Sequence, residues 1–297
     1  MTKTTASSLF EFPPTYASNI AEDARLAAFA ALVGRYKISR MMAKKLRRLE
    51  GYDIVSGSMN TRIIASHDTV DTTLGPAPTR WDELKATVSM VADIAATLDS
   101  DGIDVFFLNR VPARNITGPS AALDAAFAER PYGHTPITRV LREVLAEKFY
   151  CVNLPDRKKL LILIATDGQP TTDAGDLDHQ ALKHLLTYER GGPGQVPVAF
   201  LVCTDDEKEI AYLNEWDNSI RDLDVSDDYH TERQQIIGIQ GNGFPFSRGD
   251  WICKMLLGAV DPEIDALDET PLKLTPNRTM TGAPQKSLKR QDSCITQ

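Results

Sequence analysis

Short apolar runs alternate with helix-like segments along most of this chain. The runs at 103–108 (IDVFFL), 159–166 (KLLILIAT) and 196–203 (VPVAFLVC) are nearly continuous, which is typical of parallel strands buried on both faces. Segments with apolar residues at helical spacing lie between and around them. We expect helices at 21–49, from 80 to about 98, at 121–130, 135–149, 178–189, 207–216 and 250–260, and a last edge strand at 236–239.

This alternation predicts an α/β fold: a doubly wound, mostly parallel sheet with helices on both faces, in the manner of Rossmann-like domains. Residues 1–20 are polar around Pro13 and Pro14, and we expect a disordered lead there. Residues 21–268 should form a single domain with an N-terminal helical extension. The Thr, Pro, Lys and Ser content of 269–297 predicts a disordered tail.

Composition narrows the class of protein. The 297 residues carry a formal charge of -8 at pH 7, and the pI is near 5.2. This acidic balance argues against nucleic acid as a partner, because that would need a basic face. Four scattered cysteines form no CxxC pair and suggest reduced thiols. No signal-peptide core is visible, and no apolar run approaches the roughly 18 residues of a membrane span. We therefore expect a cytoplasmic protein.

Three segments rich in small oxygen-bearing side chains follow or precede the predicted elements. They are 56–61 after the short apolar run 52–55 (YDIV), which we interpret as the first strand, 133–136 (GHTP) before a helix, and 166–168 (TDG) after the 159–166 strand. Ligands of doubly wound sheets sit at the carboxyl ends of the strands. Hydroxyls and carboxylates are the hard ligands that Mg²⁺ prefers. Taken singly, Thr135 is explained as a helix cap before Pro136, and Asp167-Gly168 as a turn.

The order SGSM, then GHTP, then ATDG resembles the metal-ion-dependent adhesion site of von Willebrand factor type A domains. The segments KLRRLEGYDIV, TRWDELK, DGIDVFFLN and KMLLGAVDPEID further resemble intracellular, stand-alone proteins of that family, over roughly residues 25–268. The resemblance implies that Ser56, Ser58, Thr135 and Asp167 would hold Mg²⁺, or Mn²⁺ or Ca²⁺, with one position open for an acidic side chain of a protein partner. Asn60, His134 and Gly168 would then border the partner.

One feature departs from the family pattern. The first loop normally reads Asp-x-Ser-x-Ser, but Ile54 stands two positions before Ser56, so the motif aspartate and about five residues of strand are missing. Asp53 could replace that aspartate only if the strand shifted by one residue, which would turn its side chains to the other face. A misassigned exon junction would produce the same sequence.

We therefore expect a non-catalytic protein-binding module whose adhesion site is degenerate. The alternative is a metal-independent scaffold of the same fold, whose partners would contact helices or the basic stretch around Lys44–Arg48. The missing aspartate favours this alternative. A hydrolase-like α/β enzyme is a minor alternative, because Ser58 lacks the flanking glycines of a nucleophile elbow.

Overall fold

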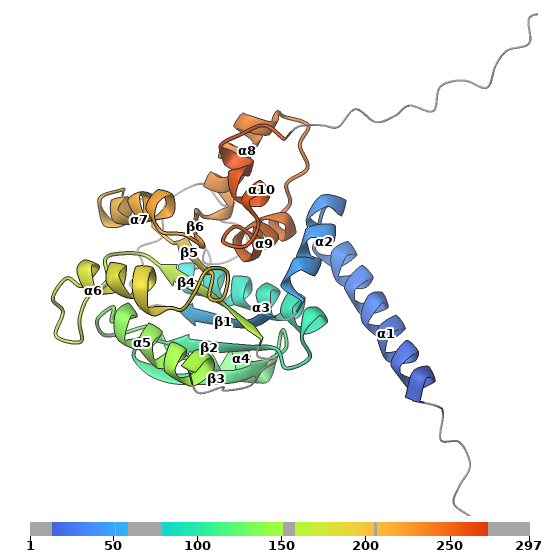
Figure 1. The fold of residues 1–297 in the computed structure, drawn as a ribbon, viewed down its shortest axis with the longest axis horizontal. Coiled ribbons are helices and arrows are strands. Elements are labelled where there is room, and N and C mark those ends of the chain that lie inside the picture. Colours follow the sequence, from blue (N-terminus) through green and yellow to red (C-terminus); the bar gives the residue numbers. More distant parts are fainter. Residues whose placement is uncertain (1–13, 51, 59–78, 151–157, 205–206, 273–297) are drawn as a thin grey trace, which may run out of the picture.

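The computed structural model describes residues 14–50, 52–58, 79–150, 158–204 and 207–272. These residues form a six-stranded sheet in the order β3-β2-β1-β4-β5-β6 (Figure 1). All neighbouring strands are parallel except the edge strand β3, which is antiparallel to β2. The strands are β1 (Tyr52–Ser58), β2 (Ile103–Phe107), β3 (Arg110–Ile116), β4 (Lys159–Thr166), β5 (Val198–Val202) and β6 (Leu223–Ser226).

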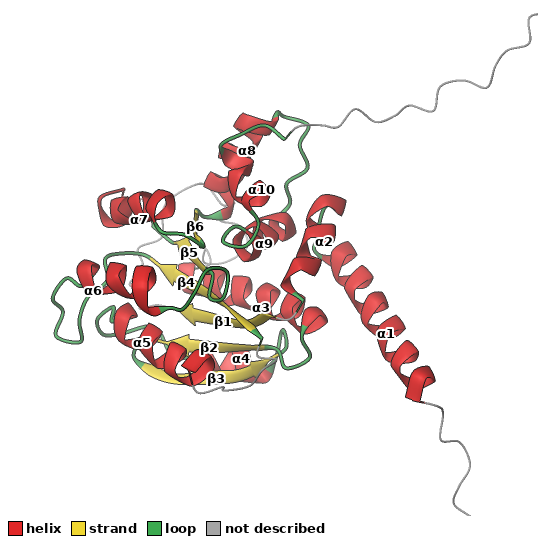
Figure 2. Cartoon of the chain, viewed as in Figure 1, coloured by secondary structure: helices red, strands yellow, loops and turns green. Residues whose placement is uncertain are grey.

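Helices cover both faces of this sheet (Figure 2). They are α1 (Pro14–Arg35), α2 (Arg40–Leu46), α3 (Arg80–Leu98), α4 (Ala121–Ala126), α5 (Ile137–Val144), α6 (His179–His184), α7 (Glu207–Ser219), α8 (Tyr229–Gln240), α9 (Arg248–Leu257) and α10 (Pro262–Asp265). Short helical turns are η1 (Arg47–Leu49), η3 (Leu145–Tyr150), η4 (Leu185–Glu189) and η5 (Ala266–Asp268). The predicted fold class, an α/β doubly wound and mostly parallel sheet, is confirmed.

The two faces of the central strand β4 belong to two separate cores. Leu161 and Leu163 pack with α2, α3 and α9, whereas Leu160 and Ile162 pack with α5, α6 and α7. Successive side chains of a strand point to opposite faces, so an uninterrupted apolar run is what a strand covered on both sides requires. This is why 159–166 was recognisable as a strand with its observed bounds.

One predicted strand was wrong, and the two observed edge strands went unpredicted. Residues 236–239 lie in α8, where Ile236 is buried and Asp228 caps the helix by accepting from the amides of His230 and Thr231. Four residues cannot distinguish a strand from one helical turn by their pattern. The observed edge strands are β6 and β3, and β3 went unpredicted because its sequence RVPARNI contains Pro112, two arginines and few apolar residues.

The N-terminal helical segment is interrupted. Lys37 adopts a positive φ of 54°, and Ser39 then caps α2 by accepting from the Met42 amide. Helix α1 already begins at Pro14, so the expectation of a disordered lead is wrong for 14–20, and 1–13 lie outside the described residues. The helix extends away from the sheet (Figure 1). Residues 273–297 of the predicted tail also lie outside the described part.

The carboxyl ends of β1, β2, β4, β5 and β6 face one edge of the sheet, because these strands are parallel. We call this the carboxyl edge. The loops that enter α5, α6, α7 and α8 start or end near it, and it is the place where a doubly wound sheet presents ligands. Within the described residues, no helix is both long enough and apolar enough to cross a membrane.

Candidate functional site at the carboxyl edge

The structure brings Thr135 and His134 to the end of β2. Asn109, two residues after β2, donates from its side-chain amide to the backbone carbonyls of Tyr132 (2.6 Å) and His134 (2.8 Å). The Tyr132 hydroxyl returns a hydrogen bond to the Asn109 carbonyl at 2.9 Å. Asp167 and Gly168 directly follow β4. The predicted second and third loops therefore both lie at the carboxyl edge.

The first predicted loop is different. Ser56, Gly57 and Ser58 are the last residues of β1 itself and not a loop after it. Ser56 is in register with Val105 and Leu163, and Ser58 with Phe107. The two serines are therefore part of the strand that pairs with β2 and β4. The side chains of Ser56 and Ser58, and all of Asn60, lie outside the described residues.

Asp53 does not lie where a motif aspartate would be needed. It is in register with Leu160 near the start of β4, seven positions before Asp167, which corresponds to roughly 20 Å along the strand direction. Its carboxylate lies 3.4 Å from the Lys148 ammonium group, which also pairs with Asp104. The expectation that Asp53 could replace the missing aspartate is therefore wrong for this register.

Two loops of the carboxyl edge are joined by direct hydrogen bonds. The Thr135 amide donates to the Thr171 hydroxyl, and the Thr171 amide donates to the Thr135 carbonyl, both at 2.9 Å. Arg139 adds a second link, because its guanidinium donates to the Leu108 carbonyl at 2.6 Å and to Asp173 at 2.9 Å. The loop before α5 is thus held against the loop after β4 by contacts within the chain.

Thr135 does not cap α5, contrary to the capping explanation. The helix begins at Ile137 with Pro136 at the cap position, and no side-chain hydrogen bond caps its start. The Ile137 amide, at the start of the helix, donates instead to the backbone carbonyl of Thr135 at 2.8 Å. Helix capping therefore gives no reason for a threonine side chain at this position.

The Asp167-Gly168 turn is built on the end of β4. The buried Thr166 hydroxyl donates to the Gly168 carbonyl at 2.9 Å, and the Tyr212 hydroxyl of α7 donates to the same carbonyl at 3.3 Å. Burial raises the pKa of Tyr212, so it remains a hydrogen-bond donor over the physiological range. The Asp167 backbone position is consequently fixed by its neighbours on both sides.

His134 is exposed and its ring lies over Gly175 in the loop after β4. A Cβ on Gly175 would come within 2.7 Å of the His134 Cε1 atom, and Gly175 has a φ of +94°. A side chain at position 175 would therefore displace the ring. His134 thus contributes to the contact between the two loops, whether or not it also touches a partner.

The chemistry that the described residues offer at this edge is limited. Asp167 and Thr135 supply a carboxylate and a hydroxyl, both of which are oxygen ligands that suit Mg²⁺. Nearby Cys203 follows β5, and burial followed by the charge of Asp167 raises its thiol pKa to about 12. A thiol with that pKa is protonated at neutral pH and is a poor nucleophile.

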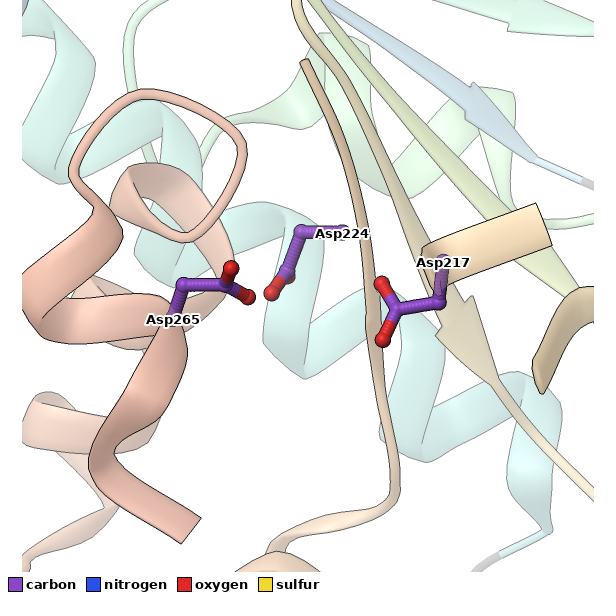
Figure 3. Close-up of side chains that lie close together, drawn as sticks. All are labelled: Asp217, Asp224 and Asp265. Carbon is purple, nitrogen blue, oxygen red and sulfur yellow. The ribbon is translucent and has the colours of Figure 1, made fainter. Parts of the chain in front are cut away.

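The sequence did not reveal a group of acidic side chains that lies around the edge strand β6. Asp217, Asp224 and Asp265 come from α7, β6 and α10, and their carboxylate oxygens lie within 4.8 Å of one another (Figure 3). The spacing of these residues in the sequence could not predict the cluster, because 48 positions separate Asp217 from Asp265. Only the packing of α10 against β6 and α7 assembles it.

No protein-family model matches this chain, and no curated protein is significantly similar to it.

Proposed function

We propose that this protein is a non-catalytic binding module of the von Willebrand A type, which contacts a protein partner through its carboxyl edge. The observation that carries the proposal is the joining of the Thr135 and Asp167 loops at that edge. The Cys203 thiol beside them is protonated at neutral pH, which suits binding better than catalysis.

In this proposal, Thr135, Asp167 and Ser58 hold Mg²⁺, and an acidic side chain of the partner takes a remaining position. Ser56 is in register with Leu163, four positions and roughly 13 Å before Asp167, so it would reach the same ion only if the end of β1 shifted its register. The donor chemistry fits, because hydroxyl and carboxylate oxygens are the preferred ligands. When bound, Mg²⁺ would give a single partner carboxylate a strong and directional contact. With Asp53 held by Lys148 at the other end of β1, we expect weak affinity for the ion.

A second candidate function is a metal-independent scaffold, in which the same edge binds a partner without an ion. A specific observation favours it: the hydrogen bonds of Asn109, Thr135 and Thr171 already hold the edge loops together. Such an edge needs no cation to order it. Its partner contacts would come from Gly168, His134 and Asn60.

Isothermal titration calorimetry of the full chain with Mg²⁺ and Mn²⁺ separates the two candidates. Asp167→Asn and Thr135→Val remove one ligand each with little change in volume. Asp176→Asn is the matched control, because Asp176 is an exposed carboxylate of the same loop. The metal-bridged form predicts binding heat that Asp167→Asn and Thr135→Val abolish and Asp176→Asn preserves.

The partner interaction needs its own measurement. Proteins captured by the immobilised full chain would be identified, and each purified candidate would be tested for binding to the Asp167→Asn and Thr135→Val variants. Loss of binding in both variants, with the Asp176→Asn control unchanged, supports the carboxyl edge as the binding surface. Unchanged partner binding in both variants contradicts the proposal, with or without metal. Binding that persists in EDTA selects the scaffold.

A further inference from the structure

The acidic cluster of Asp217, Asp224 and Asp265 lies where the C-terminal helices meet the edge of the sheet (Figure 3). Asp224 is on the edge strand β6 and is 1% exposed. Its carboxylate rests on the backbone of Gly258 in the turn after α9, where an added Cβ would come within 2.2 Å of the Asp224 oxygen Oδ1. The carboxyl group is therefore enclosed between β6 and the C-terminal helices.

Few positive charges balance these acids. Among the described residues, the buried cation beside them is Lys254 of α9, which pairs with Glu232 of α8 at 2.9 Å and with Asp268 of η5 at 3.6 Å. The charged groups that act on Asp224 and Asp265 come from four packed elements: Asp217 of α7, Lys254 of α9, Glu232 of α8 and Asp268 of η5. Asp227, in the turn after β6, is itself affected by Lys254 and Asp268.

The contact between Asp224 and Asp265 requires a proton. The carboxylate oxygens of the two residues lie within 4.8 Å of each other (Figure 3). A hydrogen bond between them needs a proton, because an ionised carboxylate can only accept. The Ser226 hydroxyl donates to Asp224 Oδ2 at 3.1 Å, so it does not supply the donor to Asp265. Burial of Asp224 and the neighbouring charge of Asp265 both disfavour ionisation of the second carboxyl group, so we expect the pair to hold one proton near neutral pH.

We propose that Asp224 and Asp265 share one proton that holds α10 against β6, so that the docking of the C-terminal helices weakens as pH rises through neutrality. Loss of the proton replaces a hydrogen bond with repulsion between two carboxylates. Asp217 increases this repulsion, and Lys254 cannot offset it fully because it also serves Glu232 and Asp268. Separation of α10 from β6 would expose Asp224 to water.

The pKa values of the acids around Lys254 agree with this direction. Burial raises the pKa of Asp224 to about 7, of Glu232 to about 7 and of Asp217 to about 6. Each pKa lies above that of an unfolded carboxyl group, so the folded state binds more protons between pH 4 and 7. The contribution of these three acids to stability is then greatest at low pH and is lost as pH rises through their folded pKa values.

The experiment measures backbone hydrogen exchange and urea unfolding of the full chain at pH 5, 6, 7 and 8, in EDTA so that no bound cation contributes. Exchange is corrected for the intrinsic rate at each pH. We expect protection of 261–272 to fall from pH 6 to pH 8 relative to β4. A difference of one bound proton changes the unfolding constant by up to about tenfold per pH unit.

Asp224→Asn should suppress this fall, because an amide donates to Asp265 without a titrating proton. Asp265→Asn should act the same way, and its exposed position makes it the safer variant for folding. Asp176→Asn is the control and should retain the wild-type slope. The proposal is overturned if protection of 261–272 is the same at pH 6 and pH 8, or if Asp265→Asn retains the wild-type slope. Neither result depends on partner or metal binding at the carboxyl edge.

Discussion

The ammonium group of Lys254 lies 2.9 Å from a carboxylate oxygen of Glu232, and both residues are 1% exposed. The pair joins α9, which carries Lys254, to α8, which carries Glu232. Glu232 also accepts from the Asp227 amide at 3.0 Å, so it ties these helices to the turn after β6. Removing one member of this buried ion pair leaves the charge of the other member uncompensated, which destabilises the folded state.

We expect Lys254→Met to destabilise the protein strongly. The substitution keeps the length of the side chain but leaves Glu232 buried without its cation, which costs on the order of 3–5 kcal/mol. Urea unfolding at pH 7 measures the loss. Lys183→Met is the control, because Lys183 pairs with Glu215 on the surface and such pairs contribute about 0–1 kcal/mol. Equal effects of the two substitutions would contradict the buried role of Lys254.

Gly258→Ala should also be destabilising, for a steric reason. The backbone at Gly258 is right-handed (φ -52°), so alanine has no conformational penalty there, but its Cβ would overlap the Asp224 carboxylate. Overpacking of this kind costs about 1–3 kcal/mol. Gly238→Ala in α8 is the matched control, since nothing lies within 4 Å of its added Cβ. We expect that control to gain roughly 0.5–1 kcal/mol from helix propensity. Thermal unfolding measures both variants: the melting temperature should fall for Gly258→Ala and rise for Gly238→Ala.

The buried Asp104 should make the protein sensitive to acid. Burial alone would raise the pKa of Asp104, but hydrogen bonds from Lys148, the Asn115 amide and Arg114 lower it overall. A lowered folded pKa stabilises the fold above the unfolded value, and this stability is lost as pH falls through the folded value. Asp104→Asn should therefore lower stability at pH 6 and flatten the decline below about pH 4. A variant with an unchanged acid profile would contradict this assignment.

Thr171→Val tests the joining of the two edge loops. The valine keeps the shape of the side chain but removes the acceptor of the Thr135 amide, which should cost about 1 kcal/mol. We expect faster hydrogen exchange in 132–136 with little change in β4 and β5. Thr172→Val is the control within the same loop, because the Thr172 hydroxyl accepts only from the amides of Ala174 and Asp176. Faster exchange at 132–136 in both variants would indicate general loosening of the loop.

Much of the architecture was predictable from local pattern. The capping box of Thr79 and Asp82 marks the start of α3, and the apolar run 159–166 matches β4 at both ends. Both patterns involve residues close together in the sequence, so they can be recognised without knowing the tertiary structure. The edge strand β3 was not predictable in this way, because its seven residues are held by pairing with β2 and show weak alternation.

The sequence by itself determined the order of strands and helices and the presence of hydroxyl and carboxylate side chains in the Thr135 and Asp167 loops. Those features depend on residue type and short spacing. Only the tertiary structure decided that Asp53 lies at the far end of β1 from Asp167, because strand register is set by pairing with β2 and β4. It also decided that Asp217, Asp224 and Asp265 meet, because long-range packing brings distant positions together.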